Sequence, residues 1–262
     1  MPLSQSLQKL RKEIGFSRNF LMLLAMGAML ADHIALTLIM NGKLYGYDIS
    51  LYNNAIELEN AKIWLILYKI MRSFGRISFP IFAFLLVEGF RKTSNLFKYF
   101  LRLLFLAIIS EIPYDLMVFN EFMTPRCFTV QNVVFTYVIA LLMLCLIKVA
   151  SSLPSFFSII PAVMAGFATK FLRTDYAIEG IALVYVFYMF RNDLNIKCII
   201  AFFITFFMSF ENYRGVAALS IFFIYFYDGK KGDLNLKRLN YLFYPLHMLV
   251  LYGILFFTYW MK

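Results

Sequence analysis

The stretch Asn19–Met40 reads NFLMLLAMGAMLADHIALTLIM, an apolar run with two ionisable residues inside it. About twenty apolar residues form a helix long enough to cross the ~30 Å hydrocarbon core of a membrane. Asp32 and His33 lie well inside this run, about thirteen residues from its first residue. A charged side chain at such a depth costs several kcal/mol, at least about 3, so it needs a partner or a purpose. The stretch therefore predicts a membrane-spanning helix that carries a functional or structural polar pair.

The composition of the whole chain agrees with this first helix. Apolar residues make up 62% of the 262 residues and charged residues only 15%, whereas soluble domains carry about a quarter charged residues. Strict alternation of apolar and polar residues is not evident, which argues against a transmembrane barrel. We therefore expect an all-α fold, a polytopic transmembrane helical bundle. It would form a single domain over residues 19–262, after a basic cytoplasmic segment at residues 1–18.

Apolar runs between clusters of charge predict about nine spans. The second run is long, and Arg72 and Arg76 interrupt it. This interruption predicts a broken helix, or an interfacial helix followed by a short span. The expected spans cover residues 19–40, 62–90, 95–118, 131–150, 154–172, 176–190, 196–210, 215–228 and 241–260.

The distribution of basic residues predicts the orientation of the bundle, because cytoplasmic loops are enriched in Lys and Arg. With the amino-terminal segment inside, the 41–61 loop falls outside and the basic turns at 91–94 and 229–240 fall inside. Lys170 and Arg173 break this pattern. We expect an N-in, C-out protein of the bacterial cytoplasmic membrane. The net charge of +10 is then explained by contact with lipid headgroups rather than with nucleic acid.

Two pairs of like charges are expected towards the outer side. Arg72 and Arg76 are one helical turn apart, and so are Glu111 and Asp115. Two like charges this close in a low dielectric need compensation, so we expect the arginines to lie opposite the carboxylates. Such an arrangement is either a structural salt-bridge network or a site that binds an anion or orients a substrate, for which forked guanidinium groups are suited.

Two more ionisable residues are expected near the cytoplasmic side, which divides the buried charges into an outer and an inner group. Glu88 precedes Arg91 and Lys92 at the end of the second span, and His247 lies near the inner end of the ninth. A histidine alone at that depth is more often structural than catalytic. The sequence has no cluster with metal-ligand spacing and no phosphate-binding loop, so we expect neither a metal nor an ATP-driven pump.

Several segments stand out in order from about residue 20 to residue 255: Asp32-His33, RSFGRISFPIFAFLLVEGF at Arg72–Phe90, Tyr99–Leu103, Ile109–Asp115, Asn132–Thr136 and Tyr244–Tyr252. Together these segments resemble the TraX family. The resemblance is specific through residue 136 and thin from 150 to 240. It implies a membrane-embedded acetyltransferase, of the kind that acetylates the amino terminus of a pilin subunit, with acetyl-CoA as donor.

The resemblance and the buried charges together predict a mechanism. His33, tuned by Asp32 or another carboxylate, would act as general base on an acceptor that enters from outside. Arg72 or Arg76 would orient the acceptor or stabilise an oxyanion. The acceptor would be a hydroxyl or amine of a glycan, or the amino terminus of a protein. Phosphates of the donor would meet basic residues at the cytoplasmic side, namely Arg91, Lys92, Lys98, Arg102 or the 230–238 loop, and the site-shaping candidates are Glu88, Glu111, Asp115, Asn132 and His247.

Two other functions stay open at this point. The same buried charges suit a transporter or channel, in which they would line a pathway for ions or a small substrate. A purely structural membrane subunit is the third alternative, and it would tolerate neutral replacements of these charges.

Overall fold

The structure, a computed structural model, describes residues 13–58, 60–152, 154–234 and 236–260. The predicted basic segment at residues 1–18 therefore lies mostly outside the described residues. Within the described ranges the protein is helical, and its only extended pairings are two isolated bridges. The main elements are α2 (Arg18–Ile34), η1 (Ala35–Lys43), α3 (Ile49–Ile56), α4 (Ala61–Gly75), α5 (Ser78–Lys92), α6 (Leu96–Phe119), α7 (Val133–Val149), α8 (Ile159–Phe171), α9 (Ala177–Met189), α10 (Leu194–Tyr213), α11 (Leu219–Tyr225), α12 (Lys237–Leu255) and η6 (Phe256–Trp260).

Each of the nine predicted spans coincides with a helical segment, and the all-helical bundle is confirmed. Among the described residues, five segments are long and apolar enough to cross a membrane, and three apolar helices are shorter. The number of crossings and the N-in, C-out orientation stay predictions. The five long segments are Arg18–Lys43, Ala61–Lys92, Val133–Ser152, Leu194–Tyr213 and Tyr241–Tyr259, and the shorter helices are Phe156–Phe171, Ala177–Met189 and Val216–Tyr225.

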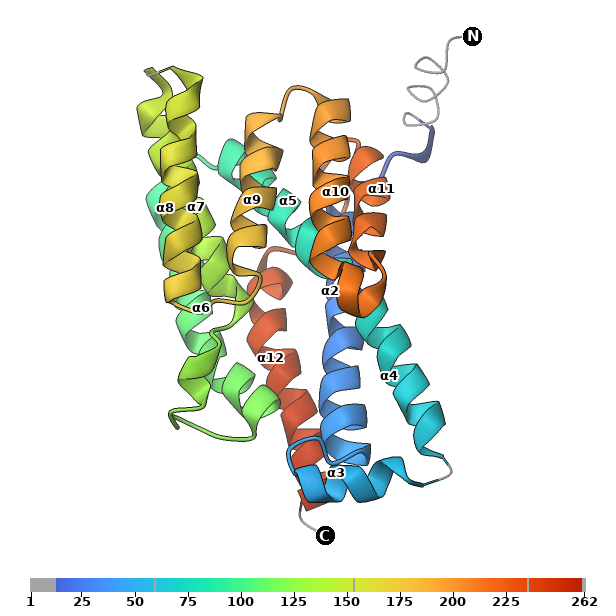
Figure 1. The fold of residues 1–262 in the computed structure, drawn as a ribbon. Coiled ribbons are helices and arrows are strands. Elements are labelled where there is room, and N and C mark those ends of the chain that lie inside the picture. Colours follow the sequence, from blue (N-terminus) through green and yellow to red (C-terminus); the bar gives the residue numbers. More distant parts are fainter. Residues whose placement is uncertain (1–12, 59, 153, 235, 261–262) are drawn as a thin grey trace.

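The second predicted span is broken, as the sequence indicates. α4 ends at Gly75 and α5 begins at Ser78, and Figure 1 shows α4 in the lower part of the bundle and α5 above it. The 41–61 segment, expected as a loop, contains α3. Asp48 caps this helix, because its Oδ1 atom accepts hydrogen bonds from the backbone N–H of Ser50 at 2.8 Å and of Leu51 at 3.1 Å. An aspartate directly before an apolar helical run is a typical helix start.

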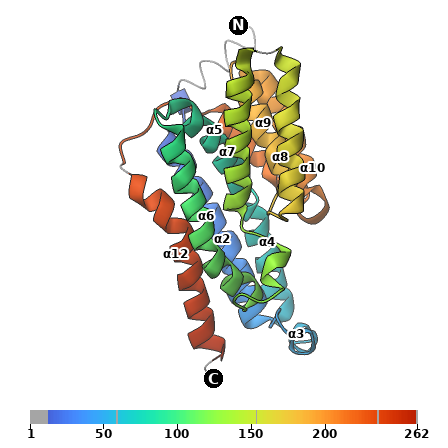
Figure 2. The same ribbon diagram turned by 90° about the vertical axis from the view of Figure 1, so that its left-hand side faces the viewer.

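The helices form two overlapping groups along the long axis of the molecule. Figure 1 shows α7 to α11 in the upper part and α4, α12 and η1 in the lower part, with α2, α5 and α6 running between the two. α12 begins near the middle of the molecule and packs against α6 (Figure 2). α12 thus begins at the edge of the bundle (Figure 2), and its middle, with His247, meets the end of α2 at His33.

Close packing between the helices depends on small residues. Ala25 and Ala28 of α2 are fully buried, and so are Ala107 of α6 and Ala140 of α7. Small residues let helix backbones approach closely, which is the usual basis of helix association in membranes. Gly75 is the extreme case. A Cβ atom added there would lie 2.3 Å from the Cβ of Asp32, so α4 approaches α2 as closely as it does only with glycine at this position.

A substitution at this glycine tests the contact between α2 and α4. Gly75→Ala forces the two helices apart, and we expect it to lower the free energy of unfolding by about 1–3 kcal/mol or more. Gly27→Ala is the matched control, because a Cβ at Gly27 meets nothing within 4 Å and alanine favours the helix by up to about 1 kcal/mol. Equilibrium unfolding of the purified variants in the same detergent measures both. Equal stabilities of the two variants would contradict the role of Gly75.

Candidate functional site

Asp32 is the centre of a buried charge cluster. Its carboxylate accepts a hydrogen bond from Arg76 Nη2 at 2.5 Å on Oδ1, and a bond from Arg72 Nη1 on Oδ2. The carboxylate side chain is 9% exposed and each guanidinium side chain 17%. One negative and two positive charges leave the cluster with an excess of positive charge. The arrangement therefore attracts anions and is itself stabilised by its central carboxylate.

Aromatic side chains surround the arginines. Arg76 donates to the hydroxyl of Tyr176 at 3.0 Å, and its guanidinium carbon lies 5.1 Å from the centre of the Tyr213 ring. The Tyr176 ring stacks on Phe79 with centroids 3.9 Å apart. Tyr176 has a left-handed backbone, with φ at +58°, which is uncommon for a residue with a Cβ and is often found at functional sites. These contacts bring the loop before α9 to the cluster.

The expected pairing of Arg72 and Arg76 with Glu111 and Asp115 is wrong. Both arginines bond to Asp32, because Gly75 brings their end of α4 directly against α2. The two carboxylates belong to α6, which packs on α7 and α12. Glu111 Oε1 and Asp115 Oδ1 are buried and without a hydrogen-bond partner among the described residues. The positive charges of Arg72 and Arg76 are thus compensated by Asp32 alone, and Glu111 and Asp115 take no part in this.

Glu111 and Asn132 join α6 to α7. Glu111 Oε2 accepts a hydrogen bond from the Asn132 backbone N–H at 3.2 Å and another from its side-chain amide. The same amide donates to the carbonyl oxygen of Ala107 at 2.9 Å, while its oxygen caps α7 by accepting from the Val134 N–H at 3.0 Å. Neither Glu111 nor Asn132 lines the cavity described below. They support the wall of that cavity from behind.

His33 is hydrogen-bonded to His247. The Nδ1 atom of His33 lies 2.6 Å from the Nε2 atom of His247. The predicted separation of an outer and an inner group is therefore wrong for His247, because α12 starts at mid-height of the molecule (Figure 1) and carries this residue to the end of α2. The expected contact of His33 with a carboxylate is also absent from the described residues, since Asp32 is taken up by the two arginines.

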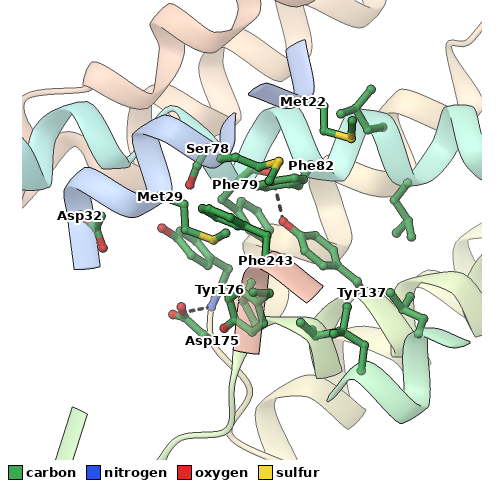
Figure 3. A pocket seen from close by; sticks show the side chains of 18 of the residues that line it. Met22, Met29, Asp32, Ser78, Phe79, Phe82, Tyr137, Asp175, Tyr176 and Phe243 are labelled. Atoms are coloured by element: carbon green, nitrogen blue, oxygen red, sulfur yellow. Dashed lines mark hydrogen bonds between the residues drawn. The ribbon is translucent and has the colours of Figure 1, made fainter. Parts of the chain in front are cut away.

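A cavity of about 560 Å³ connects His33 and the Asp32–Arg72–Arg76 cluster with one end of the bundle. It lies between α2, α5, α6 and the first turns of α12, and the loop before α9 closes it near Asp175 and Tyr176. Figure 3 shows Met22, Met29 and Asp32 facing it from α2. Arg18 and the exposed Arg102 line its other end. The cavity is thus apolar along its middle, and it carries positive charge at both ends.

Glu88 lies apart from the charge cluster, at the end of the bundle where α5 stops. It pairs with Arg91 at 3.0 Å and Lys92 at 3.1 Å, and the hydroxyl of Tyr227 donates to it at 3.4 Å. Lys92 also donates to the carbonyl oxygen of Gly229 at 3.2 Å. Glu88 does not line the cavity. It ties α5 to the segment that leads into the 229–240 loop.

The cavity residues absent from the sequence-based candidates include Tyr176, Asp175 and Arg18. Tyr176 and Asp175 lie between two short apolar helices, where a charge is expected to be solvated. The structure places them inside because Gln131 exchanges backbone hydrogen bonds with Arg173 and Asp175, at 2.9 and 3.1 Å. Arg18 directly precedes an apolar run and was assigned to topology alone. Its helical spacing from Met22, Met26, Met29 and His33 was the available signal.

Removing the central carboxylate tests the charge cluster. Asp32→Asn leaves two adjacent guanidinium groups without a counter-charge, and we expect the free energy of unfolding to fall by about 3–5 kcal/mol. Glu121→Gln is the control, because Glu121 forms an ion pair with Arg126 at 3.3 Å that is largely exposed and is expected to contribute at most about 1 kcal/mol. Equilibrium unfolding in one detergent compares the two, and equal losses would contradict the cluster's structural importance.

Comparison with known proteins agrees with the motifs around this site. Residues 17–255 match the family described as "TraX protein". A relative from Dichelobacter nodosus, named "Probable fimbrial assembly protein FimC, serogroup H1", is 29% identical over 262 residues, which cover 92% of this chain and 96% of the relative. No solved structure matches the chain. The family match includes every residue of the charge cluster, both histidines and the walls of the cavity, and the chain belongs to the TraX family.

Proposed function

We propose that this protein is an integral membrane acetyltransferase, which moves an acetyl group from cytosolic acetyl-CoA to an amine or hydroxyl acceptor. The observation that carries the proposal is the cavity, which joins a basic mouth at Arg18 and Arg102 to His33 and the Asp32–Arg72–Arg76 cluster. A single continuous space thus holds a place for an anionic donor, an apolar passage, and a candidate base. A transporter would instead use the same charges to line a pathway for its substrate, and acetyl-CoA would not stabilise it.

The dimensions of the cavity suit the donor. Arg18 and His33 are fifteen residues apart on α2, which corresponds to about 22 Å at roughly 1.5 Å per residue. The extended phosphopantetheine arm of acetyl-CoA is of similar length. Met22, Met26 and Met29 form a stripe along α2 between the two ends, and flexible thioethers adapt well to a slender chain. The phosphates would lie near Arg18 and Arg102, and the thioester near His33.

The reaction follows from the groups at the deep end of the cavity. His33 takes the proton of the acceptor amine or hydroxyl while the acceptor's nitrogen or oxygen attacks the thioester carbonyl. The positive charge of Arg72 and Arg76 stabilises the oxyanion that develops. The carbon–sulfur bond then breaks, and the imidazolium of His33 returns its proton to the departing CoA thiolate. Acetyl-CoA and acceptor become CoA and acetylated acceptor, with no other reactant.

The name of the Dichelobacter nodosus relative favours one class of acceptor over the other. A protein that shares most of its length with this chain is named for fimbrial assembly, which favours a protein subunit of a surface fibre as acceptor. A glycan of the cell envelope is the other class that the chemistry admits. Mass spectrometry of surface proteins and glycans from cells with and without this protein distinguishes the two, because the acceptor is the molecule that loses the mass of an acetyl group when the protein is absent.

The donor and the base are tested together on the purified protein and on membranes. We expect acetyl-CoA and CoA to raise Tm, by an amount that corresponds to about 2.7 kcal/mol when the ligand is at one hundred times its Kd. His33→Ala should retain this shift while acetyl transfer from radiolabelled acetyl-CoA to endogenous acceptors in membrane vesicles falls about 100-fold or more. A wild-type protein with no shift, or a fully active His33→Ala variant, would contradict the proposal.

The basic mouth is tested by two neutral replacements on the same helix. Arg102 lines the cavity, whereas Lys98, one turn earlier on α6, is exposed and does not. We expect Arg102→Ala to weaken CoA binding about tenfold through loss of a charge-assisted contact with phosphate, and Lys98→Ala to leave it within about twofold. Titration of Tm with CoA measures both. Equal affinities of the two variants would contradict the placement of the donor.

A further inference from the structure

The two histidines of the chain form one hydrogen-bonded chain with a backbone carbonyl. The protein contains two histidines in all. His33 Nδ1 and His247 Nε2 are 2.6 Å apart, and His247 Nδ1 lies 2.6 Å from the carbonyl oxygen of Phe243. The imidazole rings are nearly parallel, at 9°, with centroids 4.8 Å apart. Because the nitrogens are so much closer than the centroids, the rings meet edge to edge, as an N–H···N hydrogen bond requires.

The carbonyl at the end of this chain determines where the protons are. A carbonyl oxygen accepts and cannot donate, so His247 Nδ1 carries the hydrogen that it shares with Phe243. A neutral imidazole has one donor and one acceptor nitrogen, and His247 Nε2 is therefore the acceptor. The hydrogen between the two rings must then belong to His33 Nδ1. His33 Nε2 remains without a proton and without a hydrogen-bond partner among the described residues.

We propose that His247 is a positioning residue that holds His33 in its Nδ1–H tautomer, so that the Nε2 atom is the base. This inference rests on the proposed acetyl transfer. His33 lines the central cavity and His247 does not. His247 instead borders an apolar groove between α2 and α12, with Leu30, Leu246 and Val250. It has no access to the reacting atoms and acts through His33.

The pair also replaces the carboxylate that commonly orients a catalytic histidine. Asp32, the neighbour of His33 in sequence, accepts hydrogen bonds from both arginines. When His33 Nε2 takes a proton from the acceptor, its Nδ1–H continues to donate to His247, whose neutral ring accepts part of the positive charge. The ring of His247 is held between His33 and Phe243, which stacks on it with centroids 4.6 Å apart. Its orientation is therefore fixed by contacts on α12 itself.

Nitrogen NMR of the full-length protein, labelled with nitrogen-15 in histidine, tests the tautomers directly. The two histidines give four ring-nitrogen signals. A variant that lacks one histidine loses two of these signals, which assigns all four. At a pH where both rings are neutral, we expect both Nδ1 atoms to be protonated and both Nε2 atoms to be bare. In His247→Ala, His33 should shift towards the Nε2–H form that histidine favours in water. Leu246→Ala, beside His247 and 57% exposed, should leave both tautomers unchanged.

Kinetics separate a positioning role from a structural one. With membrane vesicles and labelled acetyl-CoA, we expect His247→Ala to lower the saturated rate about 100-fold, with the half-saturating acetyl-CoA concentration within about twofold of wild type. His247→Gln keeps an acceptor atom for His33 Nδ1–H and should recover the rate to within about tenfold of wild type.

The two proposals fail in different ways. A wild-type His33 with a protonated Nε2, or an active enzyme whose His33 tautomer is the same in His247→Ala, would overturn the role of His247. Equal losses of rate in His247→Ala and His247→Gln would overturn it as well. A protein with the expected tautomers that transfers no acetyl group to any acceptor would overturn the proposed function instead.

Discussion

One carboxylate shared by two arginines is the interaction on which the centre of this protein depends. The Asp32 carboxylate forms ion pairs with Arg72 of α4 and with Arg76, which directly follows α4. An unpaired charge of either sign is costly in this region. The contact is possible because Gly75 has no side chain where α4 meets α2. The break between α4 and α5 follows at once in the chain, and α5 then runs along the cavity. The short segment from Arg72 to Ser78 thus determines the ion pairs with Asp32, the close approach of α4 to α2 and the course of α5 along the cavity.

The cluster also determines which groups are free for chemistry. By engaging Asp32 completely, the arginines leave His33 without its sequence neighbour, and the Nδ1 atom of His33 is instead bonded to His247 of α12. The cluster retains excess positive charge beside a histidine that lines the same cavity. This arrangement suits the proposed acyl transfer, in which the histidine would take a proton and the arginines would stabilise the oxyanion.

Secondary structure could be predicted well from the sequence because the signal is strong and local. Long apolar runs bounded by charges place nine helical segments where the structure has them, and Gly75 between Arg72 and Arg76 marks the break in the second. α3 was overlooked because it is short and polar on one side, although Asp48 is a clear helix cap. Side-chain pairing could not be predicted in the same way. The rule that opposite charges pair is correct, but it does not say which carboxylate of three lies within reach of the arginines.

The sequence by itself determined that the chain is a helical bundle of membrane type, that it resembles the TraX family, and that Asp32, His33 and the arginines are its central polar residues. The composition and the apolar runs suffice for the helical bundle, and the resemblance rests on short motifs. Both depend only on neighbours in the chain. Only the tertiary structure decided that Asp32 pairs with the two arginines, that His247 is hydrogen-bonded to His33, and that Arg18 and Tyr176 line the same cavity. These contacts join residues up to 214 positions apart. They depend on where α4, α12 and the loop before α9 pack against α2, which is settled by close approach at small residues rather than by any local pattern.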